Sequence, residues 1–188
     1  MYGKIVAISF SKLYNETKVF ISDGQVMGRK KEMRIGNYEF EYVETIVPKK
    51  NQDGGIWNEF PQSRYINEGN IGLHEYGKGA FCKFKLNNAQ SVSGVYAWVL
   101  EGETDPIYIG ETNDFQKRFC MGYGTISPRN CYAGGQMTNC KMNKVVLQKY
   151  IEGKKIQIYF YSTKNYKKVE LELLNAIDTP YNAKNNKR

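Results

Sequence analysis

Five stretches of the chain carry side chains that could do chemistry. Gly94-Val95-Tyr96 and Tyr108-Ile109-Gly110 each hold a tyrosine, with eleven residues between the two phenols, and Arg118 follows Tyr108 by ten residues. Glu170 and Asn182 come later, twelve residues apart. Tyrosine is unusually frequent, at 15 of 188 residues. Its hydroxyl serves phosphate contacts and proton transfer as well as packing, so these positions are candidates for either role.

Cysteine and histidine chemistry has little support. The cysteines are Cys82, Cys120, Cys131 and Cys140, without a CxxC pair, and the single histidine is His74. This spacing argues against a zinc site, and one histidine gives little basis for a Ser-His-Asp or Cys-His mechanism. We therefore expect reduced thiols, as in an intracellular protein.

Positive charge is concentrated late in the chain. The formal net charge is +8, but residues 1–116 carry 13 basic and 15 acidic side chains, net −2, whereas residues 117–188 carry 14 and 4, net +10. A block this basic favours polyanionic partners, nucleic acid above all, although it also suits a solvated face. The sequence has no apolar run near the roughly 20 residues of a membrane span and no signal peptide, so we expect a cytoplasmic protein without membrane contact.

The first ninety residues look β-rich. Apolar residues alternate with polar ones at 6–10 and 38–42, a Ser-Asp-Gly turn follows an apolar run at 22–24, and 81–86 reads as a short strand. Residues 48–55 read as a loop. No repeat is visible, and a domain junction is acceptable at 87–91.

The second half alternates strands and helices. Residues 94–100 and 107–109 read as a hairpin, and Asn113 as the N-cap of a short helix that holds Phe115 and Phe119. Helices are expected at 139–152, with Gly153 as the stop, and at 165–177, with a strand at 156–161 between them. The order is strand, strand, helix, helix, strand, helix, which predicts an α+β fold around a small sheet (ββααβα).

These features together resemble the GIY-YIG nuclease family. The two tyrosine triplets, Arg118, Glu170 and the Pro-x-Asn ending at Asn182 stand at family-like spacing, over roughly residues 92–184. Val95 replaces the isoleucine of the first triplet, and the stretch 122–143 resembles a bacterial branch of the family. The resemblance implies hydrolysis of DNA phosphodiesters with one divalent ion, Mg²⁺, for which Mn²⁺ can substitute.

The resemblance also implies roles. Glu170 is the metal ligand, a hard oxygen ligand of the kind that magnesium prefers. Arg118 contacts the scissile phosphate, where a guanidinium fork stabilises charge. Tyr96 is the base or orients water, Tyr108 holds phosphate or water, and Asn182 braces the site. A phenol with a pKa near 10 is a poor base unless a cation lowers that value.

Alternatives remain open at several positions. Glu172 lies close to Glu170, although the spacing to Asn182 favours Glu170. Many family members place a His or Tyr about four residues after the arginine, and here Tyr123 comes one position late, so the general base is either Tyr96 or Tyr123. His74 is a remote third alternative. Gly110 lets the backbone pass close to substrate or packs the strand end against a helix.

Basic and amide side chains between residues 117 and 150 are the expected DNA contacts, because they suit phosphates and base edges respectively. The predicted DNA-binding residues are Lys117, Arg129, Asn139, Lys141, Asn143 and Lys144. A solvated charged face is the alternative for any single lysine.

The sequence thus predicts a Mg²⁺-dependent DNA endonuclease, with a β-rich recognition or dimerisation region at 1–90 and a GIY-YIG catalytic domain at 91–188. A type II restriction-type enzyme that cuts double-stranded DNA, as a possible homodimer, is the first hypothesis. A homing or repair endonuclease is the alternative, and a non-catalytic DNA-binding module is a weaker one. Whether residues 1–90 fold separately or add strands to the catalytic sheet is left open.

Overall fold

The computed structural model describes residues 6–10, 17–22 and 25–182. The turn predicted at 22–24 therefore falls largely outside the described residues. By contacts the chain divides into two units, each made of separate segments: a sheet unit (1–43, 94–111 and 157–188) and a loop-and-helix unit (44–93 and 112–156).

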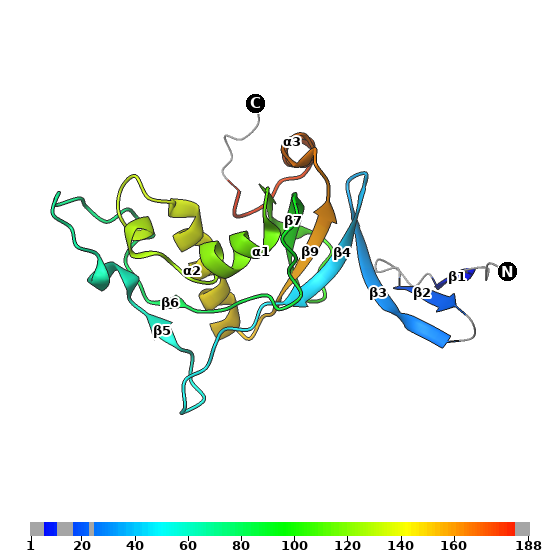
Figure 1. The fold of residues 1–188 in the computed structure, drawn as a ribbon, viewed down its shortest axis with the longest axis horizontal. Coiled ribbons are helices and arrows are strands. Elements are labelled where there is room, and N and C mark those ends of the chain that lie inside the picture. The colour runs from blue at the N-terminus through cyan, green and yellow to red at the C-terminus, as the bar shows by residue number, and fades with distance from the viewer. Residues whose placement is uncertain (1–5, 11–16, 23–24, 183–188) are drawn as a thin grey trace. The chain divides into compact units, whose positions relative to one another are not determined.

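The sheet unit is built on one seven-stranded sheet, whose strand order is β1-β2-β3-β4-β9-β7-β8 (Figure 1). The pairs β1–β2, β2–β3 and β3–β4 are antiparallel. The strands are β1 (Val6–Phe10), β2 (Thr17–Ser22), β3 (Gln25–Ile35), β4 (Tyr38–Thr45), β7 (Gly94–Leu100), β8 (Pro106–Thr112) and β9 (Ile156–Ser162). Strand β4 lies beside β9, so residues from the first part of the chain extend the sheet that holds both tyrosine triplets.

The turn between β3 and β4 requires glycine. Ile35 pairs with Tyr38, which leaves a two-residue loop whose first residue, Gly36, has φ +57°. Such short hairpin loops favour left-handed backbone, which glycine adopts without steric cost. A Cβ on Gly36 would also lie 3.0 Å from the Leu173 Cδ2 atom. Sequence and packing therefore both select glycine here.

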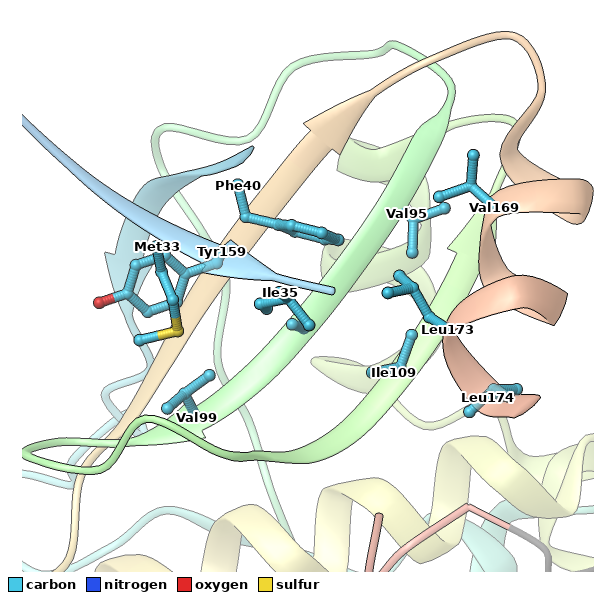
Figure 2. Close-up of a cluster of buried hydrophobic side chains, with 11 residues drawn as sticks. Met33, Ile35, Phe40, Val95, Val99, Ile109, Tyr159, Val169, Leu173 and Leu174 are labelled. Carbon is cyan, nitrogen blue, oxygen red and sulfur yellow. The ribbon is translucent and has the colours of Figure 1, made fainter. Parts of the chain in front are cut away.

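The sheet's core is apolar and lies against helix α3 (Tyr166–Ala176). Figure 2 shows Val169 and Leu173 of α3 pointing toward Val95 and Ile109 of the sheet. Phe40, whose side chain is fully buried, joins the same cluster from β4. The helical spacing of the apolar residues in α3 thus produces the packing that it predicts.

The loop-and-helix unit has shorter elements around helix α2. Its elements are β5 (Asn58–Glu59), the 3₁₀ helix η1 (Pro61–Arg64), β6 (Phe81–Cys82), α1 (Phe115–Lys117), the π-helix η2 (Arg118–Tyr123), the 3₁₀ helix η3 (Pro128–Cys131) and α2 (Met137–Ile151). Three aromatic rings four residues apart pack along α1 and η2 in tilted and edge-on pairs, with centroids 4.8 Å apart for Phe115–Phe119 and 5.4 Å for Phe119–Tyr123. This row of aromatic rings anchors the helix that carries Arg118.

The predicted α+β class is confirmed, and most predicted elements lie within two residues of those observed. Gly153, the predicted helix stop, has φ +73° and donates its N–H to the Tyr150 carbonyl at 3.0 Å. The strand predicted at 81–86 is wrong beyond Cys82, since β6 has only two residues.

In the described part of the chain, no helix combines the length and apolarity needed to cross a bilayer.

The predicted N-cap, Asn113, is wrong by one residue. Asp114 caps α1: its Oδ1 accepts from the Lys117 backbone N–H at 2.9 Å, and its Oδ2 accepts from the Ser91 hydroxyl at 2.7 Å. The hydrogen bond from Lys117, followed by that from Ser91, lowers the pKa of Asp114. Both residue types make good caps, so local preference alone could not separate them.

Candidate functional site

Tyr96 and Tyr108 lie on the neighbouring strands β7 and β8 of the sheet unit. Their ring centroids are 6.3 Å apart, and the Tyr108 ring also meets Trp98 edge-on at 6.0 Å. Tyr96 is fully buried and Tyr108 is 7% exposed. The hairpin therefore brings the two predicted phenols together, as the spacing of the triplets requires.

Gly110 makes room for the Tyr96 side chain. A Cβ on Gly110 would lie 2.5 Å from the Tyr96 Oη atom and 2.6 Å from its Cζ atom, closer than real Cβ contacts. This contact with Tyr96 is a third reason for the glycine, beside the predicted approach to substrate and the predicted packing against a helix. The last residue of the second triplet is therefore required by the tyrosine of the first.

Asn182 braces β8 at the residue next to Tyr108. Its Oδ1 accepts from the Ile109 backbone N–H at 2.9 Å, and its Nδ2 donates to the Ile109 carbonyl at 2.7 Å. Thr179 Oγ1 donates to the same Oδ1 at 2.5 Å, and the Tyr181 N–H donates to the Ile107 carbonyl at 3.1 Å. Because β8 is the last strand of the sheet, this segment satisfies its otherwise open edge.

Glu170 and Glu172 differ in their surroundings on α3. Glu170 is half-buried and lies between Val169 and the buried Leu173 and Leu174 along the helix, within its apolar stripe. Glu172 is exposed, accepts a hydrogen bond from Tyr38, and lies 3.8 Å from Lys168 Nζ. This hydrogen bond raises the pKa of Tyr38.

A metal site at Glu170 would use one protein carboxylate. Among the residues that the structure describes, no three His, Cys, Asp or Glu side chains come together. Magnesium is commonly held by one or two carboxylates together with waters and substrate phosphates. A half-buried carboxylate such as Glu170 fits that donor set. The described residues do not offer the several protein ligands that a closed structural metal site needs.

Arg118 is held by Tyr123 in the loop-and-helix unit. Its Nη2 donates to the Tyr123 hydroxyl at 2.9 Å, and its Cζ lies 4.5 Å from the centroid of the Tyr123 ring. Tyr123 is fully buried while Arg118 is half-buried. Stacking and a hydrogen bond together restrict the guanidinium, so Tyr123 is well placed to orient it.

Asn139 lies beside the same turn, at Gly122. A Cβ on Gly122 would be 3.6 Å from Asn139 Oδ1 and 3.7 Å from Arg118 Cδ. Asn139 is 1% exposed and donates its Nδ2 to Gln136 Oε1 at 2.7 Å. The prediction that Asn139 contacts DNA bases conflicts with this burial.

Asn143 is likewise a structural residue. It is fully buried, accepts from the Cys82 N–H at 3.0 Å, and donates to the carbonyls of Cys82 and Tyr123 at 2.8 and 2.7 Å. Its amide is committed to backbone groups of two other segments. The predicted contact between Asn143 and DNA conflicts with this burial and with these hydrogen bonds. The sequence alone does not show whether a polar residue on a helix faces solvent or the protein backbone.

The predicted DNA-binding cations have varied surroundings. Arg129 donates to the carbonyls of Tyr132 and Ala133 at 3.3 and 2.9 Å, so its guanidinium closes its own loop. Lys141 and Lys144 lie over the rings of Tyr76 and Phe81, at 6.0 and 5.7 Å. Lys117 is exposed.

His74 has a structural role. Its Nε2 lies 2.6 Å from the Asn130 carbonyl, and its Nδ1 accepts from the Tyr76 N–H at 3.1 Å. Donation from Nε2 and acceptance at Nδ1 describe a neutral ring with both nitrogens used. This argues against the remote alternative of His74 as the general base.

The cysteines are free thiols, as expected, and Cys82, Cys131 and Cys140 are buried. Burial raises the pKa of Cys82 to about 12 and that of Cys140 to about 12. Since the thiolate is the nucleophile, neither is suited to nucleophilic catalysis.

These raised pKa values predict alkaline instability. Thiols of the unfolded chain ionise near pH 8.5, whereas these two thiols stay protonated in the folded protein. Ionisation therefore stabilises only the unfolded chain, so the free energy of unfolding is unaffected below about pH 8.5 and falls as the pH rises toward 12. Between pH 8 and 10, urea unfolding should show a loss of about 1–2 kcal/mol for each of the two thiols. Cys82→Ala should remove its share of this pH-dependent loss, and an unchanged loss in that variant would contradict the assignment.

Each unit thus gathers part of the predicted set. The sheet unit brings together Tyr96, Tyr108, Gly110 and Asn182, with Glu170 on the helix that packs against β7. The loop-and-helix unit pairs Arg118 with Tyr123. The sequence analysis did not identify Thr179, which lies three residues before Asn182 and donates a hydrogen bond to it.

No family model, curated protein or solved structure matches the chain.

Proposed function

We propose that this protein is a magnesium-dependent DNA endonuclease with a GIY-YIG-type site. The observation that carries the proposal is the tyrosine hairpin, in which Gly110 accommodates Tyr96 and Asn182 braces the strand that holds Tyr108. Four residues from three separate motifs thus meet in one local arrangement. The element order after residue 93 also supports it, since strands β7 and β8 precede α1 and α2, and β9 precedes α3.

Arg118 is the residue that binds the scissile phosphate. A guanidinium donates two parallel hydrogen bonds to phosphate oxygens and stays charged at all relevant pH values. The Tyr123 ring and hydroxyl hold it in one orientation, which reduces the side-chain entropy lost on binding. Phosphate charge grows during hydrolysis, so a cation fixed in advance stabilises the transition state more than the substrate.

Glu170 would hold the metal. A bound magnesium ion supplies positive charge near the reacting phosphate and lowers the pKa of coordinated water. Glu172 is less suited, because its carboxylate already accepts from Tyr38 and lies near Lys168.

Tyr96 is the general base that we propose, and Tyr123 is the alternative. Both are fully buried, so burial does not separate them. The Tyr123 hydroxyl accepts a hydrogen bond from Arg118, which suits a positioning role but also supplies the neighbouring cation that a phenolic base needs. Tyr96 lies beside Tyr108 on the hairpin. In this pair Tyr108 would orient the attacking water and Tyr96 would accept its proton.

Plasmid digestion tests this proposal. We expect the purified protein to cut supercoiled plasmid with Mg²⁺ or Mn²⁺ and to be inactive with EDTA. Discrete fragments would support a restriction-type enzyme, whereas nicking or a smear would favour a homing or repair role. A restriction-type enzyme with one site per chain should be a dimer when it cuts both strands, which light scattering in the presence of DNA measures. Absence of cutting across many sequences, together with specific binding, would favour a non-catalytic module.

A further inference from the structure

The loop-and-helix unit contains a groove that the proposed catalytic residues do not occupy. Two hollows of about 590 and 500 Å³ share Cys120 and Thr125 in their linings, so they adjoin. We call them together the basic groove, because Lys49, Lys83 and Lys85 line the first and Arg64 lines the second. These cations come from the part of the chain that is near neutral as a whole.

The lining of the basic groove has more cationic than anionic side chains. The one acidic residue in its lining is Glu44, whose carboxylate accepts from the backbone N–H groups of Asn87 and Asn88 at 2.6 and 3.1 Å. Lys83 also lies 3.6 Å from Glu59, and the Glu59 side chain is 16% exposed. Four cations thus face two carboxylates, one of them already held by backbone donors, and such a surface attracts anions.

An aromatic ring accompanies these lysines. Lys49 Nζ lies 4.9 Å from the centroid of the Trp57 ring, and Trp57 is 42% exposed. Backbone hydrogen bonds from Lys49 to Lys83 and from Trp57 to Lys49, at 2.7 and 2.8 Å, hold the three residues together. Lysines beside an exposed aromatic ring are typical of nucleic-acid surfaces, since the cations meet phosphates and the ring can stack on a base.

The groove runs beside the helix that begins at Arg118. Cys120 and Met121 belong to η2, and Met121, which is 67% exposed, lines the second hollow. π-Helical turns occur frequently at functional sites. A strand in the groove would therefore lie against the helix that presents the phosphate-binding arginine.

We propose that the basic groove binds the phosphates of a DNA strand next to the scissile phosphate. The inference rests on the proposed nuclease function and adds to it a surface for the flanking DNA. Each hollow is far larger than one phosphate ion needs and falls within the size range of pockets for drug-sized ligands. Several cations along adjoining hollows favour a polyanion over a single small anion.

Fluorescence anisotropy with a labelled duplex, in Ca²⁺ to prevent cutting, tests this inference. The variant Lys49→Gln/Lys85→Gln removes two exposed charges, and Lys154→Gln/Lys155→Gln is the matched control, at two exposed lysines between α2 and β9. We expect Kd to rise about tenfold or more for the groove variant at 0.1 M salt, and the salt slope of log K to fall by about 2. The control should stay within about threefold.

Equal effects of the two variants would overturn the inference, because bulk charge would then account for binding. This outcome is distinguishable from failure of the nuclease proposal: wild type would still cut plasmid while the groove variant matched the control. If wild type neither binds nor cuts DNA, both proposals fail. Circular dichroism of each variant identifies loss of folding, which is not expected at exposed lysines.

Cys120 offers a second readout inside the groove. It is the half-exposed cysteine, whereas the other three thiols are buried. Intact-mass measurement of N-ethylmaleimide labelling should therefore show one reactive thiol, absent in Cys120→Ser. Saturating duplex should slow this labelling at least fivefold, while inorganic phosphate at equal ionic strength should not. Labelling unaffected by bound DNA would contradict occupation of the groove.

Discussion

Glu170→Gln should abolish DNA cleavage while leaving DNA binding nearly unchanged. The amide keeps the size of the carboxylate and removes the charge that a magnesium ion requires. Loss of the metal's electrostatic contribution should lower the cleavage rate about 10³-fold or more. Binding, which depends mainly on cations that contact phosphates, should stay within about threefold.

The neighbouring residue provides the matched control. Glu172→Gln makes the same chemical change two positions away on α3, at an exposed side chain that Tyr38 and Lys168 contact. Its cleavage rate should remain within about threefold, as for a surface substitution. Plasmid cleavage under single-turnover conditions measures both variants. A full loss in Glu172→Gln with activity retained in Glu170→Gln would reverse the assignment made from the spacing to Asn182.

An arginine series tests the other half of the proposed chemistry. Arg118→Lys keeps one positive charge but loses the planar fork and its stacking on Tyr123, so it should recover only part of the activity that Arg118→Ala loses. This distinguishes a phosphate-binding guanidinium from general positive charge at the same position.

The backbone of the catalytic region was largely predictable from the sequence. The apolar run at 94–100 became β7 with the predicted limits, and the helix at 165–177 became α3 with one residue fewer at each end. Both carry a strong pattern, since β7 is apolar throughout and α3 has apolar residues at helical spacing. Asn113 and Asp114 show the limit at element ends, where adjacent residues have similar capping preferences.

The partners of polar side chains were less predictable. Asn182 was expected to brace the site, but its two bonds to Ile109 depend on the chain returning to the edge of β8. Gly110 was expected to accommodate substrate or a helix, and it accommodates Tyr96. Such pairings join residues distant in sequence, and no local periodicity encodes them. Strand β4, from the first ninety residues, lies in the same sheet as β7, β8 and β9. The predicted division at residue 90 therefore concerns the roles of the two regions and does not mark a boundary of the sheet.

Asn143→Ala should be among the most destabilising single substitutions in the loop-and-helix unit. It removes the three hydrogen bonds that join α2 to Cys82 and to the end of η2 at Tyr123. Buried backbone groups that lose partners carry their desolvation cost, so the free energy of unfolding should fall by about 3 kcal/mol. Urea denaturation followed by circular dichroism measures this loss.

Asn139→Ala is the matched control, since Asn139 is equally buried on the same helix but makes one side-chain hydrogen bond, to the exposed Gln136. Its cost should be about 1 kcal/mol. If Asn143 instead read DNA bases, its alanine variant would keep wild-type stability and lose sequence discrimination alone. The structural role requires the opposite: loss of stability first, with Arg118 losing its fixed position as the carbonyl of its partner Tyr123 is released. Activity of Asn143→Ala should then fall steeply with temperature, while Asn139→Ala follows the wild type.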